Sequence, residues 1–202
     1  MTVDLTDQEK ALIVDKIREK YTQAAGAPAG YFSYPTGMQG LRQLGYPEEW
    51  WRDFPPALLE SFLGVGNPFS LGQVLPGETV LDLGCGAGLD VAVAARLVGP
   101  GGRGVGVDMT PGMITRAWEL AATLPFRNLS FQVAAADNLP FPPQFFDVVT
   151  SNGIFNLVID KEKAAGEILR VLKPGGRLLL ADMLLVTPLP PDRANLVDNW
   201  YQ

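Results

Sequence analysis

One nine-residue run constrains the fold of this chain more than any other part of its sequence. Residues 80–88 read Val-Leu-Asp-Leu-Gly-Cys-Gly-Ala-Gly, so a short apolar stretch leads into glycines at alternate positions. Glycine lets the backbone turn tightly at the end of a strand, and it lets a ligand come close to the backbone because no side chain intervenes. The run therefore predicts a buried strand, a ligand-binding turn and a helix that follows it.

The spacing of these glycines and the acid before them indicate the charge of the ligand. A dinucleotide-binding turn needs Gly-x-Gly-x-x-Gly, but the residue three places after Gly86 is Leu89. Asp82 stands two residues before Gly84, and a carboxylate there would repel a pyrophosphate but attract an ammonium group. The turn therefore predicts a ligand with a positive charge where NAD has phosphates, and it argues against an NAD-dependent dehydrogenase.

From Pro76 onward, short apolar runs alternate with stretches of helical character. Apolar strands separated by helices are typical of a parallel sheet that is covered on both faces. The expected strands are 79–83, 104–107, 129–134, 147–150 and 177–181, and the expected helices are about 90–97, 111–124 and 161–172. Residues 71–202 are therefore predicted to form an α/β domain, with a proline-rich loop and little or no helix between the third and fourth strands.

Residues 1–70 differ from the rest of the chain, because they contain ten of its nineteen aromatic residues. Residues 6–9 have the spacing of a capping box, and Ile13, Ile17 and Tyr21 then recur every four residues on one helix face. We expect an amphipathic helix here and a helical cap over the whole segment. The cap either packs as a layer on the α/β domain or covers a bound ligand as a lid.

The composition excludes several classes of function. Sixteen Lys and Arg against 22 Asp and Glu give a net charge of −6, which disfavours non-specific binding to nucleic acid or anionic membranes. One cysteine and no histidine exclude a disulfide framework, a zinc site with the usual nitrogen and sulfur ligands, and a histidine base. We expect no metal. With no apolar run of about 18 residues and a polar, acidic start, the sequence predicts a soluble cytoplasmic protein whose partner is a small molecule.

Further polar residues follow the other expected strands. Asp108 ends the second strand, where a carboxylate can accept both hydroxyls of a ribose. Asp137 follows the third strand and could accept the exocyclic amine of adenine, and Ser151 and Asn152 end the fourth. Each acid alone could be a turn or cap residue, but together with Asp82 they lie at the sheet edge where parallel sheets bind ligands. An ammonium group, a ribose and an adenine in one ligand describe S-adenosylmethionine.

At these residues the sequence resembles the class I S-adenosylmethionine-dependent methyltransferases, over about residues 75–183. The matching segments are 80–88, the strand-ending Asp108, Asp-Asn-Leu-Pro-Phe at 137–141 and Val-Leu-Lys-Pro-Gly-Gly-Arg at 171–177. The resemblance implies a Rossmann-like fold that converts S-adenosylmethionine to S-adenosylhomocysteine. It implies that Asp82 and the 84–86 backbone hold the methionine end, Asp108 the ribose, and Met109 and Asp137 the adenine. The expected cofactor-binding residues are Asp82, Gly84, Cys85, Gly86, Asp108, Met109, Asp137, Asn138 and Ser151.

Within that class the chain looks most like the arsenite methyltransferase family, from about Gly64 onward. The segments 64–68, 106–110, 151–161 and 187–190 carry this likeness. In that family, cysteines that hold trivalent arsenic stand at the positions of Val65 and Gly153, and another lies in a C-terminal part beyond the end of this chain. Arsenic(III) requires two or three thiolates, which Cys85 alone cannot supply. We therefore expect a different acceptor, and the small Gly153 suggests room for a bulkier organic molecule.

Two functional hypotheses follow. In the first, the protein methylates a small organic molecule by in-line transfer, driven mainly by proximity and the exclusion of water. In the second, it binds S-adenosylmethionine as a subunit or regulatory module without turnover of its own. Candidate residues on the acceptor side are Tyr31 and Tyr34, although both could simply pack within the cap.

The resemblance also implies a helix and two more strands after the fifth strand, but only 19 residues follow Met183. We therefore predict a sheet truncated to about five parallel strands, in the order 3-2-1-4-5, whose last strand is an edge. Such an edge is usually covered. The expected cover is the tail at 192–202, a second copy in a homodimer or a partner chain, unless the polypeptide is a fragment of a longer enzyme.

Overall fold

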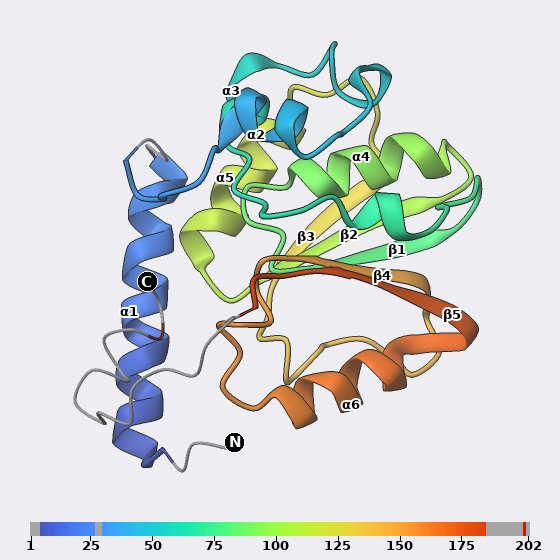
Figure 1. The fold of residues 1–202 in the computed structure, drawn as a ribbon. Helices are drawn as coiled ribbons and strands as arrows, with labels where there is room; N and C mark the ends of the chain where they lie inside the picture. Colours follow the sequence, from blue (N-terminus) through green and yellow to red (C-terminus); the bar gives the residue numbers. More distant parts are fainter. Residues whose placement is uncertain (1–4, 27–29, 185–199, 201–202) are drawn as a thin grey trace.

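The computed structural model of this chain describes residues 5–26, 30–184 and 200. Helices of the cap come first in the chain, and strands then alternate with helices (Figure 1). The cap contains α1 (Asp7–Gly26), α2 (Gly37–Gln43), α3 (Pro56–Glu60) and 3-10 turns at Glu48–Trp50 and Pro68–Leu71. The α/β part contains β1 (Thr79–Leu83), α4 (Leu89–Val98), β2 (Arg103–Asp108), α5 (Pro111–Ala121), β3 (Leu129–Val133), β4 (Phe146–Asn152), α6 (Lys161–Val171) and β5 (Leu172–Ala181).

The sheet has five parallel strands in the order β3-β2-β1-β4-β5, which confirms the predicted fold class and strand order. The central strand β1 pairs on one side with β2 and on the other with β4, so Leu81 lies opposite both Val105 and Val149. The strands β2 and β3 lie on one side of β1, whereas β4 and β5 lie on its other side, so the order in which strands are added reverses between β1 and β4. Open parallel sheets bind ligands at such a reversal, at the carboxyl ends of the strands.

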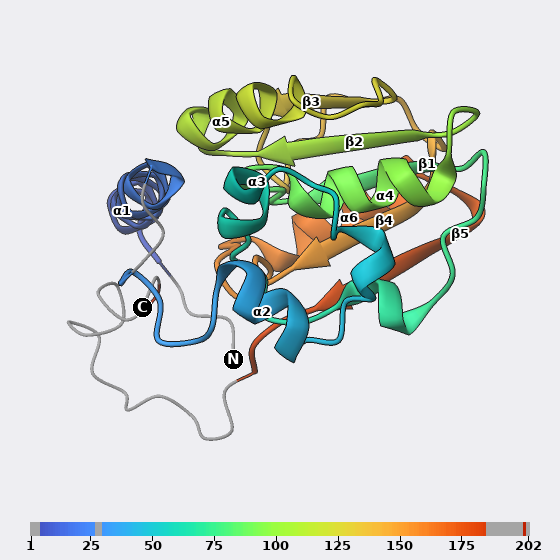
Figure 2. The ribbon, with the colours of Figure 1, turned by 90° about the horizontal axis from the view of Figure 1, so that it is seen from above.

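Helices cover both faces of the sheet, with α4 and α5 on one face and α6 on the other (Figures 1 and 2). Side chains alternate between these faces along a strand. In β1, Val80 packs in the core cluster with residues of α4 and α5, whereas Leu81 and Leu83 pack in a second cluster with Ile168 of α6. As predicted, residues 134–145 between β3 and β4 form no helix.

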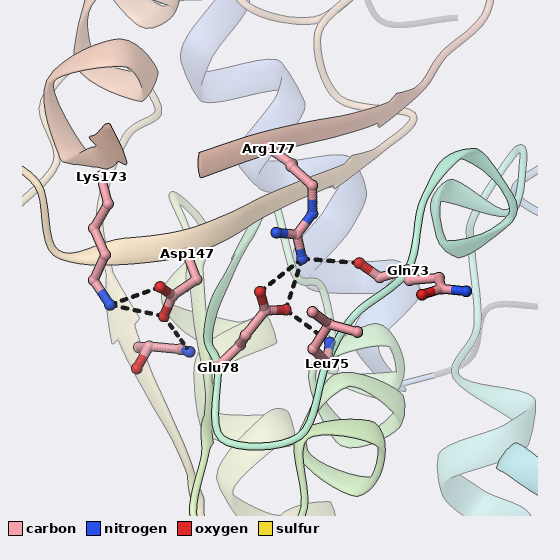
Figure 3. Close-up of polar contacts among 7 residues, drawn as sticks. Gln73, Leu75, Glu78, Asp147, Lys173 and Arg177 are labelled. Carbon is pink, nitrogen blue, oxygen red and sulfur yellow. Dashed lines mark hydrogen bonds and ion pairs between the residues drawn. The ribbon is translucent and has the colours of Figure 1, made fainter. Parts of the chain in front are cut away.

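Ion pairs fasten β5 at the amino end of the sheet, where Figure 3 shows the side chains pointing toward one another. Arg177 Nη2 lies 2.8 and 2.7 Å from the two carboxylate oxygens of Glu78, at the entrance to β1. Lys173 Nζ lies 2.7 and 2.8 Å from the carboxylate of Asp147 in β4, and the Thr79 N–H donates to that carboxylate at 2.9 Å. These contacts lie at the opposite end of the strands from the glycine turn.

The predicted amphipathic helix is confirmed as α1. Its capping box is formed, because the Thr6 N–H donates to Glu9 Oε2 at 2.7 Å and the Glu9 N–H donates to Thr6 Oγ1 at 3.3 Å. Ile13 and Ile17 are buried. The helix stands beyond the carboxyl ends of the strands and packs beside α5 (Figures 1 and 2).

The aromatic residues of the cap do not form a separate core. Tyr46, Trp51, Phe62 and Phe69 are buried in the same cluster as residues of α4. The domain boundary near residue 70 stays a prediction. The expected cover of β5 by residues 192–202 falls, apart from Trp200, outside the described residues, and within the described part β5 has no strand on its outer side.

Candidate functional site

A pocket opens at the carboxyl ends of β1, β2 and β4, below the cap. Its empty space, including the open mouth, is about 980 Å³. The lining comes from α1, the end of the cap, the glycine turn and the ends of the three strands. It comprises Ile17, Tyr21, residues 61–64, Asp82, residues 84–87, Leu89, Asp90, residues 107–110, Ala134, Ala136, residues 152–154, Leu157 and Val158.

The three glycines of the turn all have positive φ but differ in what lies beside them. A Cβ at Gly84 would collide with the Ile154 side chain, and one at Gly88 would lie 2.7 Å from the ring of Phe131. At Gly86, where φ is +51°, nothing lies within 4 Å of the position of a Cβ. Gly84 and Gly88 therefore permit close packing within the protein, whereas Gly86 presents bare backbone to the pocket.

Asp108 links the end of β2 to the glycine turn. Its Oδ2 accepts the Gly86 N–H at 3.0 Å and its Oδ1 accepts the Thr110 N–H at 2.8 Å. Burial raises the pKa of this carboxyl group, while the two backbone hydrogen bonds oppose the rise. The carboxylate of Asp108 thus holds the glycine turn in place and also lines the pocket.

Asp82 is buried beneath the turn. Thr150 of β4 donates its hydroxyl to Asp82 Oδ1 at 2.7 Å. Burial, reinforced by the nearby charge of Asp90, raises the pKa of Asp82 well above its ordinary value. A cationic ligand group in the pocket would stabilise the ionised form of Asp82 and so offset both the burial and the repulsion from Asp90.

Sequence reasoning missed Asp90, the second residue of α4. Its carboxylate accepts hydrogen bonds from Tyr46 Oη at 2.9 Å and from Asn152 Nδ2 at 3.0 Å. Burial raises its pKa to about 6. An acid in the first turn of a helix ordinarily only complements the helix dipole, so its position in the sequence gave no sign of these distant partners.

The charged groups of the pocket all have the same sign. Three carboxylates line it, those of Asp82, Asp90 and Asp108, and no Lys or Arg is among the described residues that line it. Without a cation to balance them, these carboxylates favour a positively charged ligand and disfavour an anionic one.

Three predicted residues near the carboxyl ends of the strands do not line the pocket. Ser151 is fully buried and its hydroxyl has no hydrogen-bond partner, whereas its neighbour Asn152 reaches the pocket. The reason is the alternation of side chains along β4, which turns the two residues to opposite faces. Asp137 lies 3.3 Å from Lys163 Nζ, and neither it nor Asn138 lines the pocket.

The tyrosines predicted on the acceptor side also lie outside the pocket lining. Tyr31 Oη donates to Gln23 Oε1 at 3.3 Å, and Tyr34 Oη donates to the Leu63 carbonyl at 3.1 Å. Burial raises the pKa of Tyr34 to about 12. The tyrosine that does line the pocket is Tyr21 of α1.

The expected free space beside Gly153 is already filled. A Cβ at Gly153 would lie 3.0 Å from Val65 Cγ2 and 3.1 Å from Val65 Cγ1. The two positions that carry cysteines in the arsenite methyltransferase family are thus neighbours here, and the valine occupies the space. The argument that Gly153 admits a bulkier acceptor is therefore wrong.

Three further observations concern the thiol, possible metal ligands and possible membrane spans among the described residues. Cys85 is buried and its thiol pKa is raised well above the ordinary value, so it is a poor nucleophile. No cluster of three or more His, Cys, Asp and Glu side chains in the described part of the chain is arranged to hold a metal ion. None of the described helices is long and apolar enough to cross a membrane.

Known proteins resemble this chain in both sequence and structure. Arsenite methyltransferase from Halobacterium salinarum is 44% identical over 130 residues, which are 64% of this chain and 33% of that protein. Demethylmenaquinone methyltransferase from Symbiobacterium thermophilum is 38% identical over 168 residues, which are 83% of this chain and 56% of that protein. The crystal structure of an arsenic(III) S-adenosylmethionine methyltransferase from Chlamydomonas reinhardtii aligns with a TM-score of 0.61 and 34% identity, covering 74% of this chain and 50% of that chain.

The chain therefore spans between a third and just over half of the length of these relatives. A family model described as "Methyltransferase domain" matches residues 75–201. That match covers the whole sheet and the glycine turn, and on this ground the chain belongs to the methyltransferase domain family.

Proposed function

We propose that this protein is an S-adenosylmethionine-dependent methyltransferase whose acceptor is a small organic molecule without negative charge. The observation that carries the proposal is the pairing of bare backbone at Gly86 with the carboxylates of Asp82 and Asp108 in one pocket. Membership of the methyltransferase domain family supports the same cofactor.

The residues present suit this cofactor. In this proposal Asp82 attracts the ammonium group of the methionine end, and Asp108 accepts ribose hydroxyls; the support is that both acids line the pocket and that Asp108 already holds the glycine turn. Met109, Ala134 and Ala136 give an apolar wall for an adenine ring. The cofactor, when bound, supplies an electrophilic methyl group on a sulfonium centre.

The contribution of the protein is then to position the acceptor and to exclude water. The cap side of the pocket is largely apolar, with Phe62, Leu63, Ile154, Leu157 and Val158 in its lining. Such a surface suits an apolar or aromatic body. The carboxylates make the binding of an acceptor with a phosphate or carboxylate unfavourable, because the described residues of the lining include no cation that balances them.

Arsenite is a poor candidate for the acceptor, although two of the relatives carry arsenic in their names. The chain has one cysteine, and the positions that hold arsenic in that family are Val65 and Gly153. The quinone-directed relative supports an organic ring instead, so 1,4-naphthohydroquinone is a suitable first probe.

Calorimetric titration with S-adenosylmethionine tests the cofactor assignment. Asp82→Asn and Asp108→Asn should each weaken binding by about tenfold or more, because the first removes the charge opposite the ammonium group and the second removes a charged acceptor for the ribose hydroxyls. Asp147→Asn, the same chemical change at the opposite end of the sheet (Figure 3), should leave the affinity within twofold. Equal affinities in all four proteins would refute the proposal.

A cofactor-binding subunit without turnover of its own is the second candidate. Transfer of a tritiated methyl group to 1,4-naphthohydroquinone or to a metabolite extract supports the enzyme. Binding without any transfer supports the subunit.

A further inference from the structure

The side chain of Asn152 clamps the last segment of the cap to the end of β4. Its Oδ1 accepts the N–H groups of Val65 at 2.9 Å and Gly66 at 3.0 Å, and its Nδ2 lies 2.9 Å from the Gly66 carbonyl oxygen. A Cβ at Gly64 would collide with the same Nδ2. One amide group thus holds three backbone groups of the 64–66 segment.

Asp90 sets the orientation of this amide. Its Oδ2 lies 3.0 Å from Asn152 Nδ2, and its Oδ1 accepts the hydroxyl of Tyr46, which also lies 3.1 Å from Asn152 Nδ2. A carboxylate can only accept hydrogen bonds, so it requires the NH₂ end of the amide to face it. The oxygen of Asn152 must then point toward the N–H groups of Val65 and Gly66.

The network joins three parts of the chain that are distant in sequence, namely the cap through Tyr46, α4 through Asp90 and β4 through Asn152. Tyr46 and Asp90 are 3% and 6% exposed, so water cannot readily replace the missing partner of a broken bond. Although burial raises the pKa of Asp90 to about 6, its carboxyl group is ionised at pH 7.5.

The segment that the network holds forms one wall of the pocket. Residues 61–64 and 153–154 line the pocket, and Val65 packs on Gly153 between them. The glycine turn is held separately, by the hydrogen bond from Gly86 to Asp108. A change in the network should therefore move the cap side of the pocket and leave the glycine turn in place.

We propose that Tyr46, Asp90 and Asn152 form a positioning network that sets the acceptor side of the pocket, with the negative charge of Asp90 fixing the amide of Asn152. This inference rests on the proposed function, because it assigns the cap side to the methyl acceptor. Asp90 is a positioning residue in this scheme, because it acts on the acceptor through the 64–66 segment.

Hydrogen exchange at pH 7.5 tests the network without knowledge of the acceptor. Asp90→Asn should accelerate exchange of the Val65 and Gly66 amides by about tenfold or more. Asn152→Ala removes the amide itself and should accelerate the same exchange at least as much as Asp90→Asn. Tyr46→Phe removes one hydroxyl and keeps the ring, so it provides a milder version of the test if Asp90→Asn does not fold.

Asp147→Asn is the matched control, because it removes a carboxylate that is hydrogen-bonded at the other end of the sheet. The proposal is overturned if Asp90→Asn leaves exchange at Val65 and Gly66 unchanged, or if Asp147→Asn accelerates it equally. Where the original protein methylates 1,4-naphthohydroquinone, Asp90→Asn should raise the KM for this acceptor at least fivefold, with kcat within twofold of that of the original protein. An unchanged KM for the acceptor contradicts the proposal. Failure of the proposed function is a different result, namely no binding of S-adenosylmethionine by the original protein.

Discussion

Two positions of the turn require glycine for different reasons. Gly84 must lack a side chain because Ile154 occupies the adjacent space, whereas the space beside Gly86 is open and belongs to the pocket. Both have positive φ, so both would be strained by any other residue. Only at Gly86 does an added methyl group test the ligand without disturbing protein packing.

Gly86→Ala should therefore lose stability through backbone strain alone, by about 1–2 kcal/mol, and should also weaken binding of S-adenosylmethionine by at least tenfold. Gly77→Ala is the matched control, because Gly77 also has positive φ (+87°) and open space, but lies outside the pocket lining. Chemical denaturation and calorimetry of both variants provide the comparison. Similar losses of affinity in both would show that the effect at Gly86 is general strain.

Asp90 should make stability depend on pH in a defined direction. Its pKa is raised from 3.8 to about 6, so between about pH 4 and 6 the folded protein keeps a proton that the unfolded chain loses. The free energy of unfolding contributed by this group therefore falls as pH rises through that window, by up to about 3 kcal/mol. Urea denaturation should show the stability of Asp90→Asn rising relative to the original protein by about this amount from pH 4 to 7, and a constant difference would contradict the assignment.

At the level of elements, α1 shows how an amphipathic pattern becomes a wall of the site. Ile13 is fully buried against the loop after β4, while its neighbour Leu12 is 49% exposed. One turn further along, Ile17 lines the pocket. The buried stripe therefore docks the helix and also contributes Ile17 to the pocket wall, while the role of the cap as a lid stays a prediction.

Ile13→Ala should release α1 from the domain, because it removes buried apolar contacts worth about 2–5 kcal/mol. Hydrogen exchange should accelerate across α1 while β1 and β4 keep their protection. Leu12→Ala changes the exposed neighbour and should alter exchange only slightly. Equal acceleration in the two variants would mean that α1 is not held by its buried face.

The strand boundaries show where the sequence pattern was incomplete. The expected fifth strand began at residue 177, but β5 begins at Leu172 and passes through Pro174 and Gly175. The register between β4 and β5 shifts between Phe146 and Val148, which accommodates this irregular start. Proline and glycine are poor strand formers, and residues 173–176 have no paired partner in β4, with φ of +79° at Gly175. The start of β5 is therefore an irregularity that an alternating strand pattern does not predict.

The binding site and the ion pairs that hold β5 lie at opposite ends of the sheet. The carboxylates of Asp82 and Asp90 in the pocket are buried, and the chain carries a net charge of −6. Buried charges are screened by salt much less than surface charges. Ligand binding should therefore persist at an ionic strength that screens the interactions between surface charges.

S-adenosylmethionine at 100 times its dissociation constant should stabilise the folded chain by about 2.7 kcal/mol, which raises Tm by roughly 5–10 °C for a chain of this size. Thermal denaturation in 0.05 M and 0.5 M NaCl provides the measurement, and the increase should be similar in both. NADH serves as the control ligand and should produce no increase. An increase with NADH, or one that disappears in 0.5 M salt, would contradict the proposed site.

The sequence by itself determined the α/β class, the glycine turn and the positions of Asp82 and Asp108, because each is encoded locally at the end of a strand. Parallel strands bring such ends to one edge wherever the helices pack. Only the tertiary structure decided that Asn152, and not Ser151, faces the pocket, because packing selects which face of a strand is which. It alone also joined Asp90 to Tyr46, 44 residues away, and to Asn152, 62 residues away. A local pattern carries no information about contacts at such separations, and burial of the network within the folded core establishes them.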